Sequence, residues 1–186
     1  MGASSSQAIA KSPRPWGAPT RIRMNTAIDS VASLADVLRV DDLPHGDLAA
    51  LLAAHGLRLH RVADGLPIPG SFWGDPEAGV IGIAVYVRGD TPVHSLLHEA
   101  CHLIVLPPER REQVHTDATD SDIEEDATCY LQILLAADLP GVGSERLMAD
   151  MDAWGYSFRL GSTRAWFERD AEDARAWLME RNLLPS

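Results

Sequence analysis

Hydrophobic and polar positions along the chain predict a mixed α+β domain. Residues 79–87 (GVIGIAVYV) are rich in β-branched side chains, which is typical of a buried strand, and residues 57–62 predict a second strand. From residue 93 to residue 104 the apolar positions keep helical spacing, until Pro107 and Pro108 prevent the helix from continuing. The pattern therefore predicts a strand followed directly by a helix, with a small sheet against which that helix packs.

Other helices are expected on both sides of this central pair. Residues 28–40 and 46–54 predict two helices before it, and residues 144–153 and 162–184 predict two after it. The first of the last two is expected to be capped by Ser144 and to end at Gly155. In the last helix Trp166 and Trp177 occupy inward positions.

A further helix is predicted at residues 121–135. Its apolar positions form one stripe, which we expect to face the core, made of Ile123, Ala127, Tyr130, Leu131 and Leu134.

The central helix carries the sequence His98-Glu99-Ala100-Cys101-His102, an HExxH pattern. Thr91 is its expected N-cap and Pro92 its first residue. Residues four apart share one face of a helix, so His98 and His102 can direct ring nitrogens at one metal ion. Glu99 then lies beside that ion, where a carboxylate can act on water. The pattern predicts a catalytic Zn²⁺ site.

Such a site needs a third protein ligand and an open position. At about 100° per residue, Glu124 lies at one edge of the apolar stripe and Asp126 at the other, whereas Glu125 points away. Glu124 is therefore the expected third ligand, and Asp126 is the reserve. His115, in the segment 107–120, is a rival ligand or a substrate contact. Stabilisation of an acidic first turn by the helix dipole explains part of this acidic run without any metal.

The HExxH pattern followed by Glu124-Glu125-Asp126-Ala127-Thr128-Cys129-Tyr130 resembles the ImmA/IrrE family of gluzincin-like metallopeptidases, over residues 79–140. The resemblance implies a zincin-like fold in which His98, His102 and Glu124 bind zinc. Cys101 stands where the family has glycine, and Thr128 where it has asparagine. Thr128 is four residues after Glu124, so its hydroxyl can accept a hydrogen bond from a ligand imidazole.

Composition and charge narrow the class of protein. The chain has 186 residues, 46% of them hydrophobic, which suits one domain over residues 24–186. Residues 1–23 are rich in Ser, Pro and Ala, lack the apolar core of a signal peptide and are expected to form a flexible tail. Two cysteines suit a reducing, cytoplasmic compartment, and no apolar run is long enough for a membrane span. A net charge of −11 argues against nucleic acid as a partner.

The sequence therefore predicts a zinc metallopeptidase that acts on a peptide or protein, including regulatory proteins, with Glu99 as general base. Tyr156 and Arg159 are candidates for stabilising an oxyanion. Residues 80–87 are expected to pair with an extended substrate. Two alternatives remain: a metal-binding regulatory module without turnover, and a structural-zinc or interaction domain in which a fourth ligand such as His115 closes the site.

Overall fold

The structure is a computed structural model and describes residues 36–116 and 121–185. The predicted tail at residues 1–23, and the greater part of the helix expected at residues 28–40, lie outside these ranges. Within them the chain is mixed α+β, with a three-stranded sheet and seven α-helices. No helix of the described part of the chain is long and apolar enough to cross a membrane.

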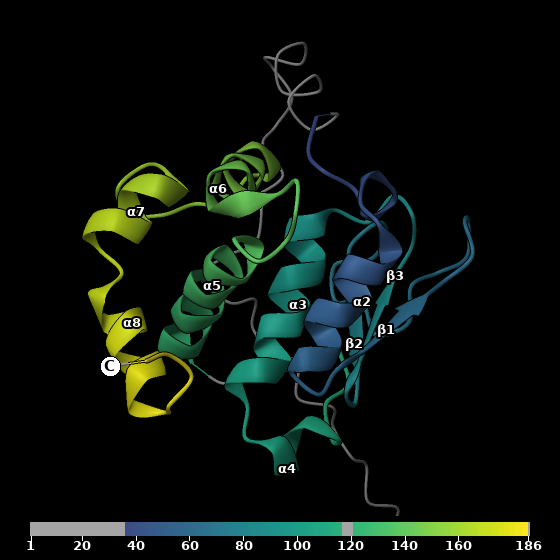
Figure 1. The fold of residues 1–186 in the computed structure, drawn as a ribbon, viewed down its shortest axis with the longest axis horizontal. Helices are drawn as coiled ribbons and strands as arrows, with labels where there is room; N and C mark the ends of the chain where they lie inside the picture. Colours follow the sequence, from purple (N-terminus) through teal and green to yellow (C-terminus); the bar gives the residue numbers. More distant parts are fainter. Residues whose placement is uncertain (1–35, 117–120, 186) are drawn as a thin grey trace, which may run out of the picture.

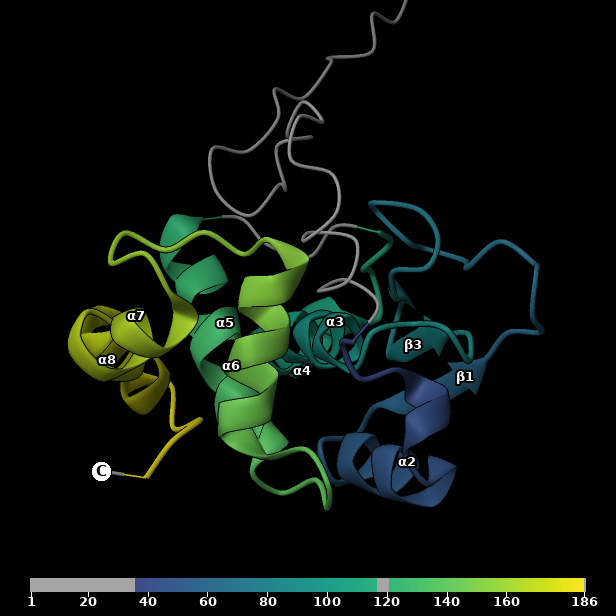
Figure 2. The same cartoon turned by 90° about the horizontal axis from the view of Figure 1, so that it is seen from above.

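The elements stack in layers from the sheet to the C-terminus (Figure 1). The sheet is covered by α3 (Val93–Val105), and α3 packs on its other side against α5 (Asp122–Ala136) and α6 (Gly143–Trp154). The short helices α7 (Thr163–Arg169) and α8 (Glu172–Glu180) form the outer layer beyond α5 and α6. Seen from above, α3 lies between the sheet and the C-terminal helices (Figure 2).

The sheet has the strand order β1-β3-β2. Strand β1 (Arg58–Arg61) follows α2 (His45–Ala54) and pairs in parallel with β3 (Ala84–Val87), and β3 pairs antiparallel with β2 (Gly79–Ile81). The single strand predicted at residues 79–87 is therefore wrong: the segment is a hairpin. Gly82 takes a positive φ of 59°, which a two-residue hairpin turn requires and which a run of β-branched neighbours conceals.

The strand edge expected to receive substrate is already occupied. On the outer side of β2, the Val80 amide donates to Gly70, and the Thr116 amide donates to Val80. The Gly82 amide in turn donates to Val114. Since β3 lies between two strands, neither part of residues 80–87 has a free edge, and the expectation of peptide pairing along this segment is wrong.

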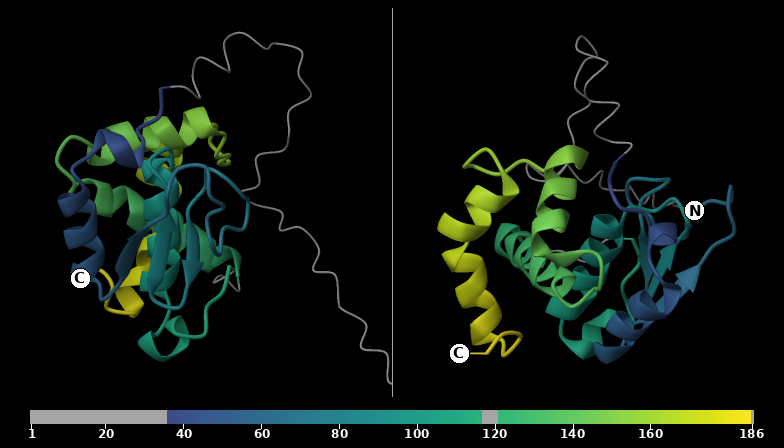
Figure 3. Two further views of the ribbon diagram at one scale, coloured as in Figure 1. Left: turned by 90° about the vertical axis from the view of Figure 1, so that its right-hand side faces the viewer. Right: turned by 45° about the horizontal axis from the view of Figure 1, so that its top comes forward.

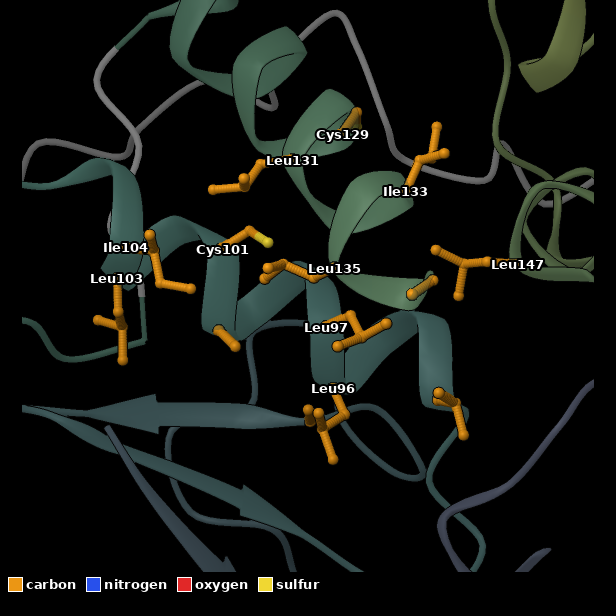
Figure 4. Close-up of a cluster of buried hydrophobic side chains, with 14 of the residues drawn as sticks. Leu96, Leu97, Cys101, Leu103, Ile104, Cys129, Leu131, Ile133, Leu135 and Leu147 are labelled. Carbon is orange, nitrogen blue, oxygen red and sulfur yellow. The ribbon is translucent and has the colours of Figure 1, made fainter. Parts of the chain in front are cut away.

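Helix α3 is buried on nearly all sides because it separates two layers. Its apolar side chains point both ways: Leu96 lies toward the strands, and Cys101 lies between α3 and α5 (Figure 4). The helix begins one residue later than predicted, with Pro92 as its N-cap, and Thr91 Oγ1 instead accepts the Arg88 amide at 2.9 Å. It ends at Val105, before Pro107, as predicted.

The C-terminal region is more divided than its pattern suggested. Residues 162–184 form α7 and α8, separated at Asp170 and Ala171, rather than one helix. Ser162 is the N-cap of α7, whereas Ser144, the expected N-cap of α6, does not cap that helix and donates to the Ile133 carbonyl at 2.7 Å. The outer layer formed by α7 and α8 lies on the side of the molecule opposite β1 (Figure 3).

Two predicted features of this region are present in the structure. Helix α6 ends at Gly155, whose φ of 105° belongs to the left-handed region that a helix end commonly uses. Trp166 is buried, and Trp177 is partly buried against the core.

Candidate metal centre

The two histidines of the HExxH pattern face one another across a turn of α3. His98 Nε2 and His102 Nε2 are 3.0 Å apart, and their rings meet edge to face. Both side chains are largely buried, because α3 lies under α5. The pattern therefore brings two imidazole nitrogens to one point, as the spacing of the two histidines predicts.

Glu125 completes the cluster. Its Oε1 lies 3.2 Å from His98 Nε2, and its Oε2 lies 3.6 Å from His102 Nε2. Among the described residues, His98, His102 and Glu125 are the group whose ligand atoms all lie within 4.8 Å of one another. The expectation that Glu125 points away is wrong, and Glu124, the expected third ligand, is outside this group.

Glu125 faces the histidines because α5 is packed on two sides, against α3 and against the C-terminal helices. Tyr130, taken as part of the core stripe, stacks on Phe167 of α7 with ring centroids 4.7 Å apart. The face toward α3 instead carries Glu125, Thr128 and Cys129, which are three and four residues apart. A stripe of large apolar residues identified the outer contact of α5, so the inward face was assigned about one residue away.

Thr128 contacts the second histidine. Its Oγ1 lies 3.3 Å from His102 Nδ1, the nitrogen opposite the one that faces the cluster, and Thr128 is fully buried. A hydrogen bond to Nδ1 selects the tautomer and fixes the ring plane of a ligand histidine. This is the contact that the sequence predicts for Thr128, with Glu125 rather than Glu124 as its neighbour in the cluster.

Electrostatics in the cluster favour a proton when no metal is bound. Burial alone would lower the pKa of His98, but the Glu125 carboxylate, 3.2 Å from its Nε2, outweighs it and raises this pKa well above its usual value. The Cys129 thiol, also buried, lies within hydrogen-bonding reach of the His98 ring. A cation is therefore stabilised at this position, whether it is a proton or a metal ion.

Aromatic rings form the next layer around the cluster. The Tyr156 ring lies 5.8 Å from the His98 ring and 5.6 Å from the His94 ring, and Trp154 lies 5.2 Å from His94. Burial raises the pKa of Tyr156, so its phenol keeps its proton. His94 is fully buried, and neither of its ring nitrogens has a partner among the described residues.

The remaining candidates lie away from the cluster. Asp126 is exposed on α5, and His115 is at the edge of the sheet, where its backbone bridges to Ile81 and its Nδ1 lies 2.7 Å from Thr116 Oγ1. Arg159 pairs with Asp170. Of the two candidates for stabilising an oxyanion, Tyr156 and Arg159, only Tyr156 lies next to the cluster.

The catalytic candidate Glu99 is largely buried on α3, directly after His98. The sequence interpretation identified this residue, both histidines, Thr128 and Tyr156, but missed Glu125 and Cys129. Their four-residue separation, which matches that of His98 and His102, is the signal that would have indicated one shared face of α5.

The donor set fits a zinc ion. Tetrahedral Zn²⁺ with bonds of about 2.0 to 2.1 Å needs ligand atoms separated by about 3.3 Å. The two Nε2 atoms are 3.0 Å apart, His98 Nε2 is 3.2 Å from Glu125 Oε1, and His102 Nε2 is 3.6 Å from Glu125 Oε2. With one ligand atom taken from each residue, all three lie within 4.8 Å of one another. Two imidazoles and one carboxylate are also a ligand set typical of catalytic zinc, which leaves one position open.

Comparisons with known proteins add no relative. No protein-family model matches the chain, and neither a curated protein nor a solved structure matches it.

Proposed function

We propose that this chain is a zinc-dependent peptidase. The observation that carries the proposal is the convergence of His98, His102 and Glu125, with Glu99 as the residue that follows His98 on α3. His98, Glu99 and His102 keep the HExxH pattern on which the resemblance to the ImmA/IrrE family rests, whereas the third ligand is Glu125 in place of Glu124, the residue that the resemblance implies. A zincin-like arrangement of the sheet, α3 and α5 belongs to the same proposal.

Each residue of the site has its own role in the proposed peptide hydrolysis. When bound, zinc supplies a Lewis acid and lowers the pKa of water at its open position to about 7. Glu99 accepts the proton from the attacking water and returns it to the departing amine. Tyr156 keeps its phenolic proton and donates a hydrogen bond to the oxyanion that develops at the scissile carbonyl. Thr128 holds the His102 ring in place.

The experiment that tests this proposal compares the native chain with Glu99→Gln at equal zinc occupancy. The substitution keeps the size of the side chain and removes its basicity, so hydrolysis of peptides should fall by roughly 10²-fold to 10⁴-fold. Zinc content, measured by mass spectrometry of the intact protein, should stay the same. Equal rates for the two chains, or no hydrolysis by the zinc-loaded native chain, would contradict the proposal.

A structural zinc site is the second candidate, and Cys129 favours it. This thiol lies against His98, on the same face of α5 as Glu125, and it could supply a fourth ligand. The absorption spectrum of the metal-substituted protein, measured without substrate, distinguishes the structural site from the peptidase site. With Co²⁺ in place of zinc, a Cys129 thiolate ligand produces an intense ultraviolet charge-transfer band that is lost in Cys129→Ser and kept in Cys101→Ser. The peptidase proposal expects no such band.

A further inference from the structure

A carboxylate that the proposed reaction does not use lies close to the cluster. Glu77 precedes β2 and is partly exposed; its Oε2 accepts a hydrogen bond from Ser95 Oγ at 2.9 Å. Ser95 lies four residues before Glu99, and residues at this separation share one face of a helix. Glu77 is therefore held above the same face of α3 that carries Glu99, about one turn nearer the start of the helix.

The second oxygen of Glu77 connects it to the aromatic layer. Glu77 Oε1 accepts a hydrogen bond from Trp154 Nε1 at 2.8 Å. Tyr156, two residues farther along, is near both Glu77 and Glu125: after burial, both carboxylates contribute to raising the pKa of its phenol. The Tyr156 ring also lies 5.8 Å from the His98 ring, so Tyr156 is near both Glu77 and the metal cluster.

The negative charge of Glu77 is not balanced by a neighbour. Within the described ranges, no Lys, Arg or His side chain forms an ion pair with it. Its two hydrogen bonds come from neutral donors, and each carboxylate oxygen can accept a further one. A partly buried carboxylate without a counter-ion is stabilised by any cation that reaches it.

The rings beside Glu77 favour the same kind of ligand. Trp154 and Tyr156 are both partly exposed, and the negative faces of aromatic rings attract ammonium and guanidinium groups. Trp154 already has the Arg39 guanidinium over its ring, 5.2 Å from the centroid, and it meets Glu77 with its Nε1 edge rather than with a ring face. Glu77 forms no ion pair with a described residue and lies near Trp154 and Tyr156, so this place suits an organic cation rather than an anion or an alkyl chain.

We propose that Glu77, with Trp154 and Tyr156, forms a subsite for a cationic group of the substrate, a lysine or arginine side chain near the scissile bond. The proposal rests on the peptidase function, since it assigns the selectivity of that same site. The ammonium group of a peptide amino terminus has the same chemistry and is distinguished in the test below. The overall charge of −11 adds a general attraction for basic substrates.

A purely structural role would also explain the two hydrogen bonds of Glu77. In that case Glu77 only ties the segment before β2 to α3 and α6, and its charge would not affect which peptide is bound. Two variants separate these roles. Glu77→Gln removes the charge and keeps one acceptor. Ser95→Ala keeps the charge and removes the bond that Ser95 donates to Glu77, together with the one that Ser95 Oγ accepts from the Ala78 amide. Glu180→Gln, at the far end of α8, is the matched control for the loss of one charge.

The first measurement is the cleavage profile of the zinc-loaded chain on a mixed peptide pool, with and without acetylated amino termini. We expect Lys or Arg to be enriched at one position beside the cut. Glu77→Gln should lower kcat/KM for these peptides about tenfold relative to neutral ones, the effect of losing one charge-assisted hydrogen bond. Ser95→Ala and Glu180→Gln should keep the enrichment. Enrichment that disappears on acetylation assigns the cation to the amino terminus.

Cleavage without basic enrichment, or enrichment that Glu77→Gln retains, overturns the subsite and leaves the peptidase proposal intact. Absence of all cleavage overturns the peptidase proposal instead, and binding then decides the subsite. In zinc-loaded Glu99→Gln chain labelled with ¹⁵N, an acetylated, amidated Ala-Lys-Ala peptide should shift the Trp154 indole resonance, assigned with Trp154→Phe. The Ala-Gln-Ala counterpart should not. No shift with the lysine peptide, or an equal shift in Glu77→Gln, contradicts the subsite.

Discussion

Glu125 Oε1 lies 3.2 Å from His98 Nε2, although the two residues belong to different helices and are separated by 27 positions. The adjacent carboxylate, Glu124, is outside the group of ligand atoms that converge. This difference between neighbours determines the coordination chemistry that we propose, and it can be tested directly.

Glu125→Ala should lower zinc occupancy sharply, because it removes one of three ligands and leaves two imidazoles alone. Glu124→Ala is the matched control, with the same change in charge one residue away, and should retain zinc. Dialysis against a zinc buffer followed by elemental analysis measures both. If Glu124→Ala loses the metal and Glu125→Ala keeps it, the original assignment from the sequence is right and the geometry of α5 is not as described.

Thr128→Val should weaken zinc binding without unfolding the chain. The substitution keeps the branched shape of a fully buried side chain and removes the hydroxyl that lies 3.3 Å from His102 Nδ1. Loss of such a contact typically lowers metal affinity by about 10-fold to 100-fold. Competition with a chelator of known affinity gives the value, and Thr128→Ser should restore most of it. An unchanged affinity in Thr128→Val would show that this hydroxyl does not orient His102.

Zinc affinity should change with pH even at pH values above about 6.5, the usual pKa of histidine. Burial opposes the charged form of His98, but the Glu125 carboxylate raises its pKa well above 6.5, so a proton competes with the metal at neutral pH. As pH falls through this raised pKa, the apparent affinity should fall by up to about tenfold per pH unit for each proton displaced. Chelator competition from about pH 9 downward measures the profile. A constant affinity down to about pH 6.5 would contradict the raised pKa.

His94→Phe should make the fold less sensitive to acid. Burial, followed by His98 and Arg39, lowers the pKa of His94 from 6.5 to about 3, so below pH 6.5 the unfolded chain binds a proton that the folded chain excludes. Stability should therefore fall as pH decreases between these values, by up to about 1.4 kcal/mol per unit from this group. Phenylalanine does not titrate, so the variant removes this contribution. Neither ring nitrogen of His94 has a partner among the described residues, so the substitution breaks no hydrogen bond to them.

Urea unfolding between about pH 7 and pH 4 measures the effect of this substitution. His45→Phe, at the exposed start of α2, serves as the control and should keep the acid sensitivity of the native chain. Equal pH dependence in the native chain and His94→Phe would show that His94 is protonated in the folded state.

Much of the site was predictable because it depends on local geometry. The four-residue separation of His98 and His102 places both rings on one helix face wherever that helix packs, and Glu99 follows from the same spacing. The proline pair after residue 106 ends the helix by sterics alone. Thr128 was identified in the same way, from its position on α5 relative to the acidic run.

The remaining features depended on how the elements meet. The sequence by itself determined that two helices carry the site residues, but their tertiary contacts decided that Glu125, and not Glu124, reaches the histidines. Helix α5 is covered by α3 on one side and by the C-terminal helices on the other, so its apolar positions run around most of its surface and do not indicate which side faces the metal. Likewise, only the packing of α6 beside α3 brings Trp154 to Glu77, 77 positions earlier in the chain. A helix propensity or an apolar period describes one segment at a time, whereas these contacts depend on the relative rotation of two packed helices.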